Sequence, residues 1–123
     1  MKIYRCELCG NIVTKPVDGK GPLQCCGTQM KELKAGVTDA ALEKHVPAMK
    51  VEGNTLTVTI GETIHPMTDA HYIQMILVRQ GDKVQYVSLE STREPTATFL
   101  INPDEPVEAY EYCNLHGLWM NSL

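Results

Sequence analysis

Four of the five cysteines lie close together near the start of the chain, with a spacing that is typical of a metal site. They are Cys6, Cys9, Cys25 and Cys26, and none of the four histidines falls among them. Two cysteines three residues apart can direct both thiolates at one ion, and Gly10 lets the backbone turn tightly around the sulfurs. Neighbouring side chains normally diverge, so the adjacent pair predicts a distorted tetrahedron. Soft sulfur ligands limit the metal to zinc or iron, and disulfides remain a third interpretation.

The fifth cysteine and the four histidines form a second candidate set, which is spread along the rest of the chain. Its members are His45, His65, His71, Cys113 and His116. Cys113 and His116 have a Cys-x2-His spacing at the end of a predicted strand, where a loop can turn both inward. Prolines closely follow His45 and His65 and restrict the local backbone. Taken singly, a histidine is more often a surface residue and a lone cysteine more often a small apolar one, so spacing alone leaves this site open.

The chain divides into two parts of different character. Residues 1–36 contain the cysteine-rich segment, a Gly/Pro/Lys-rich connector and few apolar residues. A unit with so small a core usually needs a metal or disulfide staple. Residues 37–123 carry a succession of strand signals and form the second predicted domain.

The second part predicts an all-β domain. Residues 55–60 alternate polar and apolar side chains with a period of two, as a half-buried strand does. Further strands are expected over 72–79, 83–89, 96–101 and 107–112, and a short helical turn over 38–44. Six or seven short strands without long helices favour an antiparallel, immunoglobulin-like β-sandwich.

Composition excludes several classes of protein. The 123 residues are 43% hydrophobic and 21% charged, which is ordinary for a folded domain. A net charge of -4 gives no global basic field for nucleic acid. No apolar run is long enough for a membrane span, and residues 1–6 lack the apolar core of a signal peptide. We therefore expect a cytoplasmic protein with neither nucleic acid nor membrane as partner.

Several motifs in order give the chain a clear resemblance. Residues 6–10 (CELCG) and 25–27 (CCG) are similar to desulforedoxin. Residues 43–47 (EKHVP), 65–73 (HPMTDAHYI) and 113–119 (CNLHGLW) are similar to the neelaredoxin-type catalytic domain. Nearly the whole chain therefore resembles the desulfoferrodoxin family, the two-iron form of superoxide reductase.

The resemblance implies two iron centres. Cys6, Cys9, Cys25 and Cys26 would hold an Fe(Cys)4 centre in a distorted tetrahedron. The four histidines would supply four equatorial imidazoles to a catalytic Fe(His)4(Cys) centre, with Cys113 as the axial thiolate. Glu43 matches a carboxylate that takes the sixth position in the oxidised state, and Lys44 matches a lysine beside the open position.

The resemblance also implies an activity and partners. The expected reaction reduces superoxide to hydrogen peroxide with one electron and two protons, the electron coming from a rubredoxin-like donor. A homodimer is expected, and we favour a structural role for the Fe(Cys)4 centre, since members of the family that lack it remain active. Three alternatives stay open: a two-iron electron-transfer protein without catalysis, a zinc-stapled binding module, and a superoxide dismutase.

Overall fold

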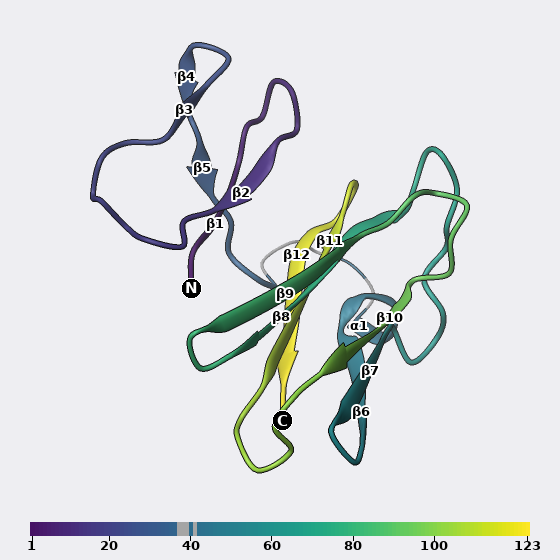
Figure 1. Cartoon of the computed structure of the whole chain (residues 1–123). Helices are drawn as coiled ribbons and strands as arrows, with labels where there is room; N and C mark the ends of the chain where they lie inside the picture. The colour runs from purple at the N-terminus through teal and green to yellow at the C-terminus, as the bar shows by residue number, and fades with distance from the viewer. Residues whose placement is uncertain (37–39, 41) are drawn as a thin grey trace. The chain divides into compact units, whose positions relative to one another are not determined.

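The computed structural model describes residues 1–36, 40 and 42–123 of the chain. The chain folds as two compact units, Met1–Lys34 and Ala35–Leu123 (Figure 1). The division of roles between residues 1–36 and 37–123 stays a prediction. The helical turn expected over 38–44 falls partly on residues outside the description, and the one helix in the described part is α1, Leu42–His45.

The first unit is a thin arrangement of very short strands. Strands β1 (Ile3–Arg5), β2 (Ile12–Thr14) and β5 (Lys31–Glu32) form an antiparallel sheet in the order β2-β1-β5, and β3 (Gln24–Cys25) pairs with β4 (Thr28–Gln29). Its buried apolar side chains are Ile3, Cys6 and Met30 among the residues that are described. So small a core agrees with the expectation that this unit depends on a staple.

The second unit is a sandwich of two antiparallel sheets. One sheet has the strand order β10-β7-β6 and the other has the order β12-β11-β8-β9. Their bounds are β6 Pro47–Glu52, β7 Thr55–Ile60, β8 Ile73–Gln80, β9 Lys83–Ser88, β10 Thr96–Leu100, β11 Glu108–Cys113 and β12 Gly117–Ser122. The predicted all-β class and antiparallel, immunoglobulin-like sandwich are confirmed.

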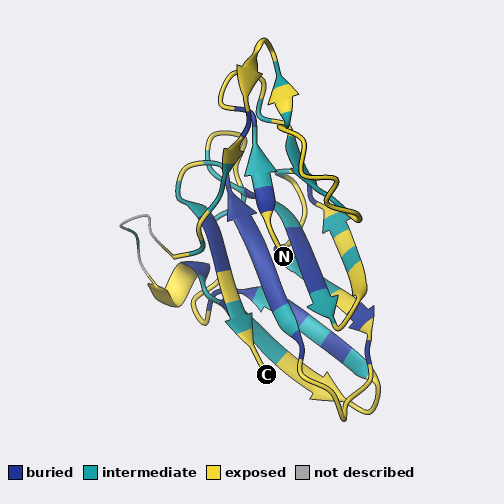
Figure 2. Cartoon of the chain, turned by 90° about the vertical axis from the view of Figure 1, so that its left-hand side faces the viewer, coloured by how far each residue is buried: buried dark blue, intermediate teal, exposed yellow. Residues whose placement is uncertain are grey.

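The core lies between the two sheets and follows from the period-two pattern of the strands. On β7 the buried residues are Leu56, Val58 and Ile60, which alternate with half-buried threonines. They meet Ile76 and Val78 from β8 within one cluster of buried residues. In Figure 2 the central strands are largely dark blue and the connecting turns largely yellow, as a sandwich with polar connections requires.

Two strands of the sandwich were not predicted from the sequence. Strand β6 begins at a proline and carries Lys50 and Glu52, which depress strand propensity, so its pattern gives little signal. Strand β12 overlaps the motif of residues 113–119, for which a loop is expected from the sequence. Its pairing with β11 identifies it as a strand. Both segments are therefore strands because of the hydrogen bonds to their neighbouring strands, and not because of their own residue pattern. Among the described residues, no helix has the length and apolar character needed to span a membrane.

Replacing Leu56 by alanine should lower the free energy of unfolding of the sandwich by about 2–5 kcal/mol, because its fully buried side chain would leave a cavity. Leu100, 70% exposed on the neighbouring strand β10, supplies a matched control that should cost less than about 1 kcal/mol. Urea unfolding followed by the fluorescence of Trp119, the single tryptophan, measures both. Equal losses would contradict this placement of the core.

Candidate metal centres

The five donors of the second set lie in the connections at one end of the sandwich, where strands begin or finish. Pro47 at the start of β6 pairs with Ile60 at the end of β7, so the segments carrying His45 and His65 are neighbours. Cys113 at the end of β11 pairs with Gly117 at the start of β12 and with Ile73 at the start of β8. His71 precedes that start of β8, and His116 lies in the turn between β11 and β12. Antiparallel pairing therefore gathers the five donors.

The four imidazole rings form a nearly square arrangement. Neighbouring rings follow the order His45, His65, His71 and His116, with centroid separations of 4.7, 4.5 and 5.0 Å and a closing separation of 4.8 Å. All four neighbouring pairs are edge-to-face, with interplanar angles between 66° and 80°. The diagonal from His45 to His71 is longer, 6.4 Å. The four rings therefore surround one space into which an ion could be bound.

The thiol of Cys113 lies against this square of rings. Its Sγ is 3.4 Å from Nε2 of His65 and 3.9 Å from Nδ1 of His116. The ligand atoms of His45, His65, Cys113 and His116 all lie within 4.8 Å of one another. His71 falls outside that tightest group, and its Nε2 is buried without a hydrogen-bond partner among the described residues. An unpartnered ring nitrogen beside the other donors suits a metal ligand.

Hydrogen bonds determine which ring nitrogen is available on His65. Its Nδ1–H donates to the Pro66 carbonyl at 2.7 Å, which leaves Nε2 as the lone-pair atom that faces Cys113. In a metal-binding histidine the second nitrogen is normally held in this way, because its hydrogen bond sets the tautomer. The proline next to His65 therefore contributes a carbonyl in addition to restricting the backbone.

Burial keeps His45 and His65 neutral near pH 7. Desolvation, aided by the charges of neighbouring rings, lowers the pKa of His45 and of His65 to about 4, and desolvation also lowers the pKa of His71. Neutral imidazole is the form that binds a metal. Burial raises the pKa of the Cys113 thiol, while backbone N–H groups of Leu115 and His116 point at its sulfur and act in the other direction. A bound cation is the natural partner for that thiolate.

A β-bulge adjusts the strand that carries Cys113. The register of β11 and β8 is regular from Glu108 to Tyr112 and then shifts by one residue, so that Cys113 faces Ile73 rather than Gln74. Cys113 and Ile73 are both fully buried. Bulges are frequent beside functional sites because they redirect a side chain. The shift lets the thiol enter the interior while His71, two residues before Ile73, stays at the edge.

Gly61 lets the segments carrying His45 and His65 approach closely. Its φ is +84°, and a Cβ there would lie 2.8 Å from the carbonyl oxygens of Glu43 and Lys44. The Gly61 N–H donates to the Val46 carbonyl at 3.3 Å, which ties the loop after β7 to the end of α1. Only glycine accommodates both the positive φ and this contact.

Two residues near the site were missed by reasoning from the sequence. Glu111 is fully buried, and its Oε1 is 3.9 Å from Nδ1 of His45. Burial raises the pKa of Glu111 well above its ordinary value. Trp119 stacks on the His45 ring at 5.1 Å, and its Nε1–H donates to the His116 carbonyl at 3.0 Å. The signal for Glu111 was available, because a period of two places it on the face of β11 that carries Cys113.

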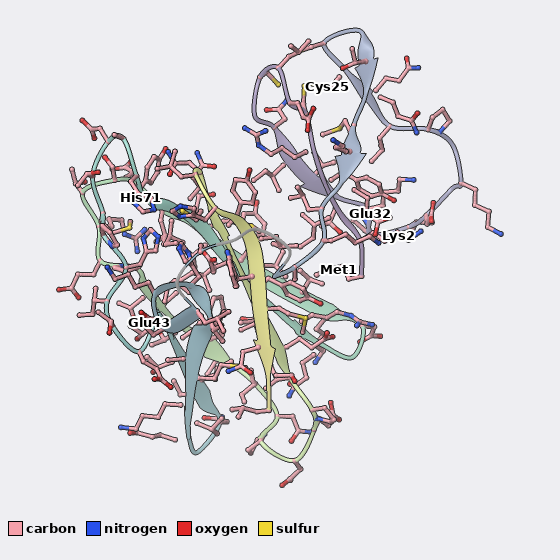
Figure 3. The ribbon with its side chains drawn as sticks, turned by 180° about the vertical axis from the view of Figure 1, so that it is seen from behind. Met1, Lys2, Cys25, Glu32, Glu43 and His71 are labelled. Atoms are coloured by element: carbon pink, nitrogen blue, oxygen red, sulfur yellow. The ribbon has the colours of Figure 1, made fainter. Side chains whose placement is uncertain are left out.

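The structure places Glu43 and Lys44 on α1, directly before His45, and both are exposed. Lys44 lies close enough for its charge to contribute, after burial, to the lowered pKa of His45, His65 and His71. Figure 3 shows ring nitrogens gathered beside His71 and labels Glu43 on α1. Within the described residues the Glu43 carboxylate belongs to neither group of possible metal ligands. The roles of both residues stay predictions.

The four cysteines of the first unit also converge. Their sulfurs all lie within 4.8 Å of one another, with 3.5 Å between Cys9 and Cys25 and 3.9 Å between Cys25 and Cys26. All five cysteines are described and free, and these separations are far longer than a disulfide bond. Cys26 has a φ of +53°, an uncommon conformation for a side-chain-bearing residue, which lets adjacent side chains point at the same centre.

The electrostatics of this cluster favour a soft cation. A hydrogen bond from the Cys9 backbone N–H is the main cause that lowers the pKa of the Cys6 thiol to about 6. The close sulfurs of Cys9 and Cys25 raise the pKa of Cys26 to about 12. Four thiolates this close repel one another unless a cation lies between them, and a four-sulfur set fits iron or zinc.

Both donor sets fit the metals that their chemistry implies. The first offers four sulfurs. The second offers four imidazoles, two of them fully buried, around one thiol, and Nε2 of His71 is buried without a hydrogen-bond partner in the described part of the chain. Imidazole with one thiolate suits iron, and the five residues of this set would hold it.

Comparison with known proteins gives matches over nearly the whole chain. The family model described as Desulfoferrodoxin matches residues 37–122, and that described as Desulfoferrodoxin, N-terminal domain, matches residues 1–33. A desulfoferrodoxin of Nitratidesulfovibrio vulgaris is 47% identical over 120 residues, covering 96% of this chain and 93% of the relative. A desulfoferrodoxin homolog of Archaeoglobus fulgidus is 43% identical over 121 residues, covering 98% and 96%.

A solved structure agrees with these matches. The crystal structure of the superoxide reductase from Treponema pallidum superposes with a TM-score of 0.79 and 32% sequence identity. It covers 98% of this chain and 99% of that chain. The similarity therefore includes both compact units in sequence order.

Gly61→Ala should release the metal of the histidine set while the four-cysteine centre keeps its own. The added Cβ would clash with the carbonyls of Thr63, Glu43 and Lys44, which would displace the segments that carry His45 and His65. Gly53→Ala is the matched control, because Gly53 also has a positive φ (+61°) but has no atom within 4 Å of an added Cβ. Iron per chain and visible absorbance would measure the loss. Equal retention in both variants would show that this close approach is not needed.

Proposed function

Because this chain belongs to the desulfoferrodoxin family, we propose that it reduces superoxide to hydrogen peroxide at an iron held by four histidines and one cysteine. The observation that carries the proposal is the nearly square ring of four imidazoles with the Cys113 thiol against it. The ligands are His45, His65, His71, His116 and Cys113. The metal of both centres is iron, with Cys6, Cys9, Cys25 and Cys26 holding the other one.

The reaction consumes one electron and two protons for each superoxide and yields one hydrogen peroxide. An iron ion held by these residues would supply that electron in its ferrous form, and an external donor would then reduce it again. Neutral imidazoles add no negative charge, so the ring of histidines does not repel an approaching anion. Cys113 donates electron density from a buried position, where water does not compete for its sulfur.

Lys44 is proposed to guide superoxide to the site. The chain has a net charge of -4, which repels an anion, so a local positive charge is needed at the entrance. Lys44 is exposed and directly precedes His45, and its charge is felt by three of the rings. We propose that its ammonium also orders water that delivers protons to the product.

Glu43 is proposed to act as a gate. It is exposed on α1, next to Lys44, and the Thr63 N–H donates to its backbone carbonyl at 3.0 Å. That hydrogen bond anchors its backbone, and the exposed carboxylate would be the group that turns toward a bound iron. The gate is proposed to open before the next superoxide enters.

The proposed partners rest on the family, and the proposed compartment rests on the free cysteines. We propose a rubredoxin-like electron donor, a homodimer and a structural role for the four-cysteine centre. Support for the structural role comes from the small core of the first unit, which gains folding free energy when a metal is bound. All five cysteines are described and free, as in a reducing compartment such as the cytoplasm.

The function is tested by stoichiometry. The reduced, iron-loaded protein should yield one hydrogen peroxide for each superoxide consumed, release no oxygen and lose one reducing equivalent. A dismutase would produce oxygen and half as much peroxide. A simple electron carrier would not consume superoxide faster than its spontaneous decay. Either of these results would overturn the proposal.

Lys44→Ala should lower the second-order rate constant for superoxide about tenfold, because the local attraction is lost. The dependence of that rate on ionic strength should flatten as well. Lys83→Ala is the control, since it removes the same charge from the start of β9, which pairs with the far end of β8. Pulse radiolysis over a series of salt concentrations measures both rates. Identical behaviour of the two variants would remove the guiding role from Lys44.

A further inference from the structure

The loop that carries His71 is closed locally but needs an anchor to the sandwich. Thr68 and His71 exchange backbone hydrogen bonds of 2.9 and 3.1 Å, and the Thr68 hydroxyl accepts a further bond from the His71 N–H at 3.1 Å. These bonds shape the turn. They do not determine where the turn lies relative to the other ligands.

Asn114 provides that anchor. Its Oδ1 accepts from the Tyr72 N–H at 2.9 Å, and its Nδ2 donates to the Ala70 carbonyl at 3.1 Å. Its own backbone N–H donates to the Tyr72 carbonyl at 3.2 Å. Ala70 and Tyr72 are the two neighbours of His71, so one residue holds the backbone on both sides of that histidine.

The chemistry of the side chain suits this role. The Tyr72 N–H only donates and the Ala70 carbonyl only accepts, so the partner must offer one acceptor and one donor on a short, planar group. A carboxylate would offer an acceptor to both partners, and an alanine would offer nothing. The orientation of the Asn114 amide is therefore decided by its partners.

Asn114 lies between two of the proposed ligands along the chain, so its hydrogen bonds connect the His71 loop to both of them. It directly follows Cys113 and lies two residues before His116. Backbone held by Asn114 is thus joined both to the thiol and to a neighbouring ring, and His71 and His116 are adjacent in the square at 5.0 Å. Three donors from two segments that are distant in sequence become one rigid group.

We propose that Asn114 is a positioning residue that holds His71 in register with Cys113 and His116. It acts through the backbone of Ala70 and Tyr72 and touches neither the metal nor the substrate. The proposal rests on the ligand set proposed above but not on the reduction of superoxide. Its test can therefore succeed even if the protein proves to have another activity.

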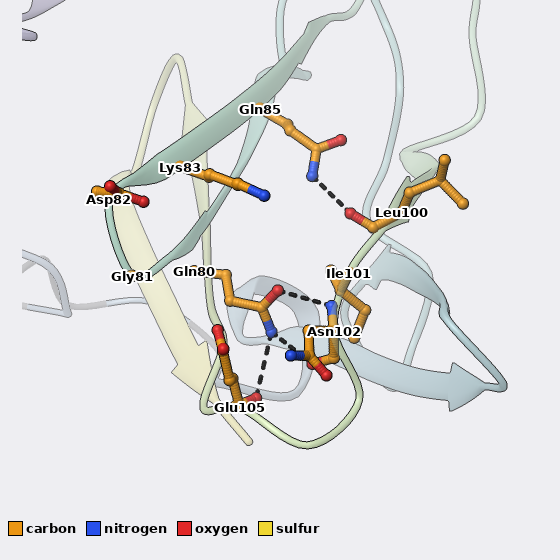
Figure 4. A pocket seen from close by; sticks show the side chains of 9 residues that line it. All are labelled: Gln80, Gly81, Asp82, Lys83, Gln85, Leu100, Ile101, Asn102 and Glu105. Carbon is orange, nitrogen blue, oxygen red and sulfur yellow. Dashed lines mark hydrogen bonds between the residues drawn. The ribbon is translucent and has the colours of Figure 1, made fainter.

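The opposite end of the sandwich supplies a matched control. Gln80, at the other end of β8, clamps a loop in the same manner: its Oε1 accepts from the Asn102 N–H at 2.8 Å, and its Nε2 donates to the Asn102 carbonyl at 2.7 Å (Figure 4). These bonds cross a pocket lined by the turn at Gly81 and by Leu100. Gln80→Ala removes an equivalent amide clamp about 23 Å from Ile73 at the start of β8, given the rise of a strand.

The experiment compares Asn114→Ala, Asn114→Asp and Gln80→Ala in the full, iron-loaded chain. An excess of a ferrous chelator draws out the metal, and visible absorbance follows each centre separately. Asn114→Ala should lose iron from the histidine set about 10–100-fold faster than the unaltered chain, as loss of a supporting hydrogen bond does. Release from the four-cysteine centre should be unchanged and provides an internal reference.

The other variants decide between positioning and general destabilisation. Asn114→Asp keeps the bond from Tyr72 and loses the bond to Ala70, so its release should be intermediate, and it carries the test if the alanine variant fails to fold. Gln80→Ala should lower the unfolding temperature and leave iron release and the thiolate absorption band unchanged. Release at the unaltered rate from the foldable Asn114 variants, or equally fast release from Gln80→Ala, would overturn the proposal.

Discussion

Four imidazole rings and one thiol are gathered at one end of the sandwich, and a cation between them would satisfy their lone pairs. His45 and His65 are buried and cannot turn to water, and Nε2 of His71 lacks a hydrogen-bond partner in the described structure. An uncompensated group of this kind costs free energy for each buried polar atom. The remainder of the second unit can be understood as the means of bringing these donors together and supporting them from behind.

The antiparallel sandwich brings the donors together because successive connections between its strands alternate between the two ends of the sandwich. The ligands occupy the connections at one end of the sandwich. That end holds the last residues of β7 and β11 and the first residues of β6, β8 and β12. Local exceptions to regular structure then adjust individual donors: a bulge at Cys113, a left-handed glycine at Gly61 and a side-chain amide at Asn114. The regular strands make the domain rigid, and these irregular features set the position of individual ligand side chains.

The two centres solve different problems. The sandwich buries a continuous apolar core and folds around donors that its own packing positions. The first unit buries few apolar side chains, and its four sulfurs, half of them exposed, repel one another without a metal. Metal and fold therefore depend on each other more strongly in the small unit, which explains how two centres in one chain can differ in role.

The sequence by itself determined the kinds of donor, their division into four thiols and a mixed set, and the alternation that makes a sandwich. Donor chemistry and period-two burial are properties of single residues and their near neighbours, so strand 55–60 was predicted to the residue. Strands β6 and β12, the bulge at Cys113 and the approach of Glu111 to His45 were decided only by the tertiary structure. Each of these depends on a partner far away in the chain, and spacing along a sequence carries no information about which distant backbone will lie opposite.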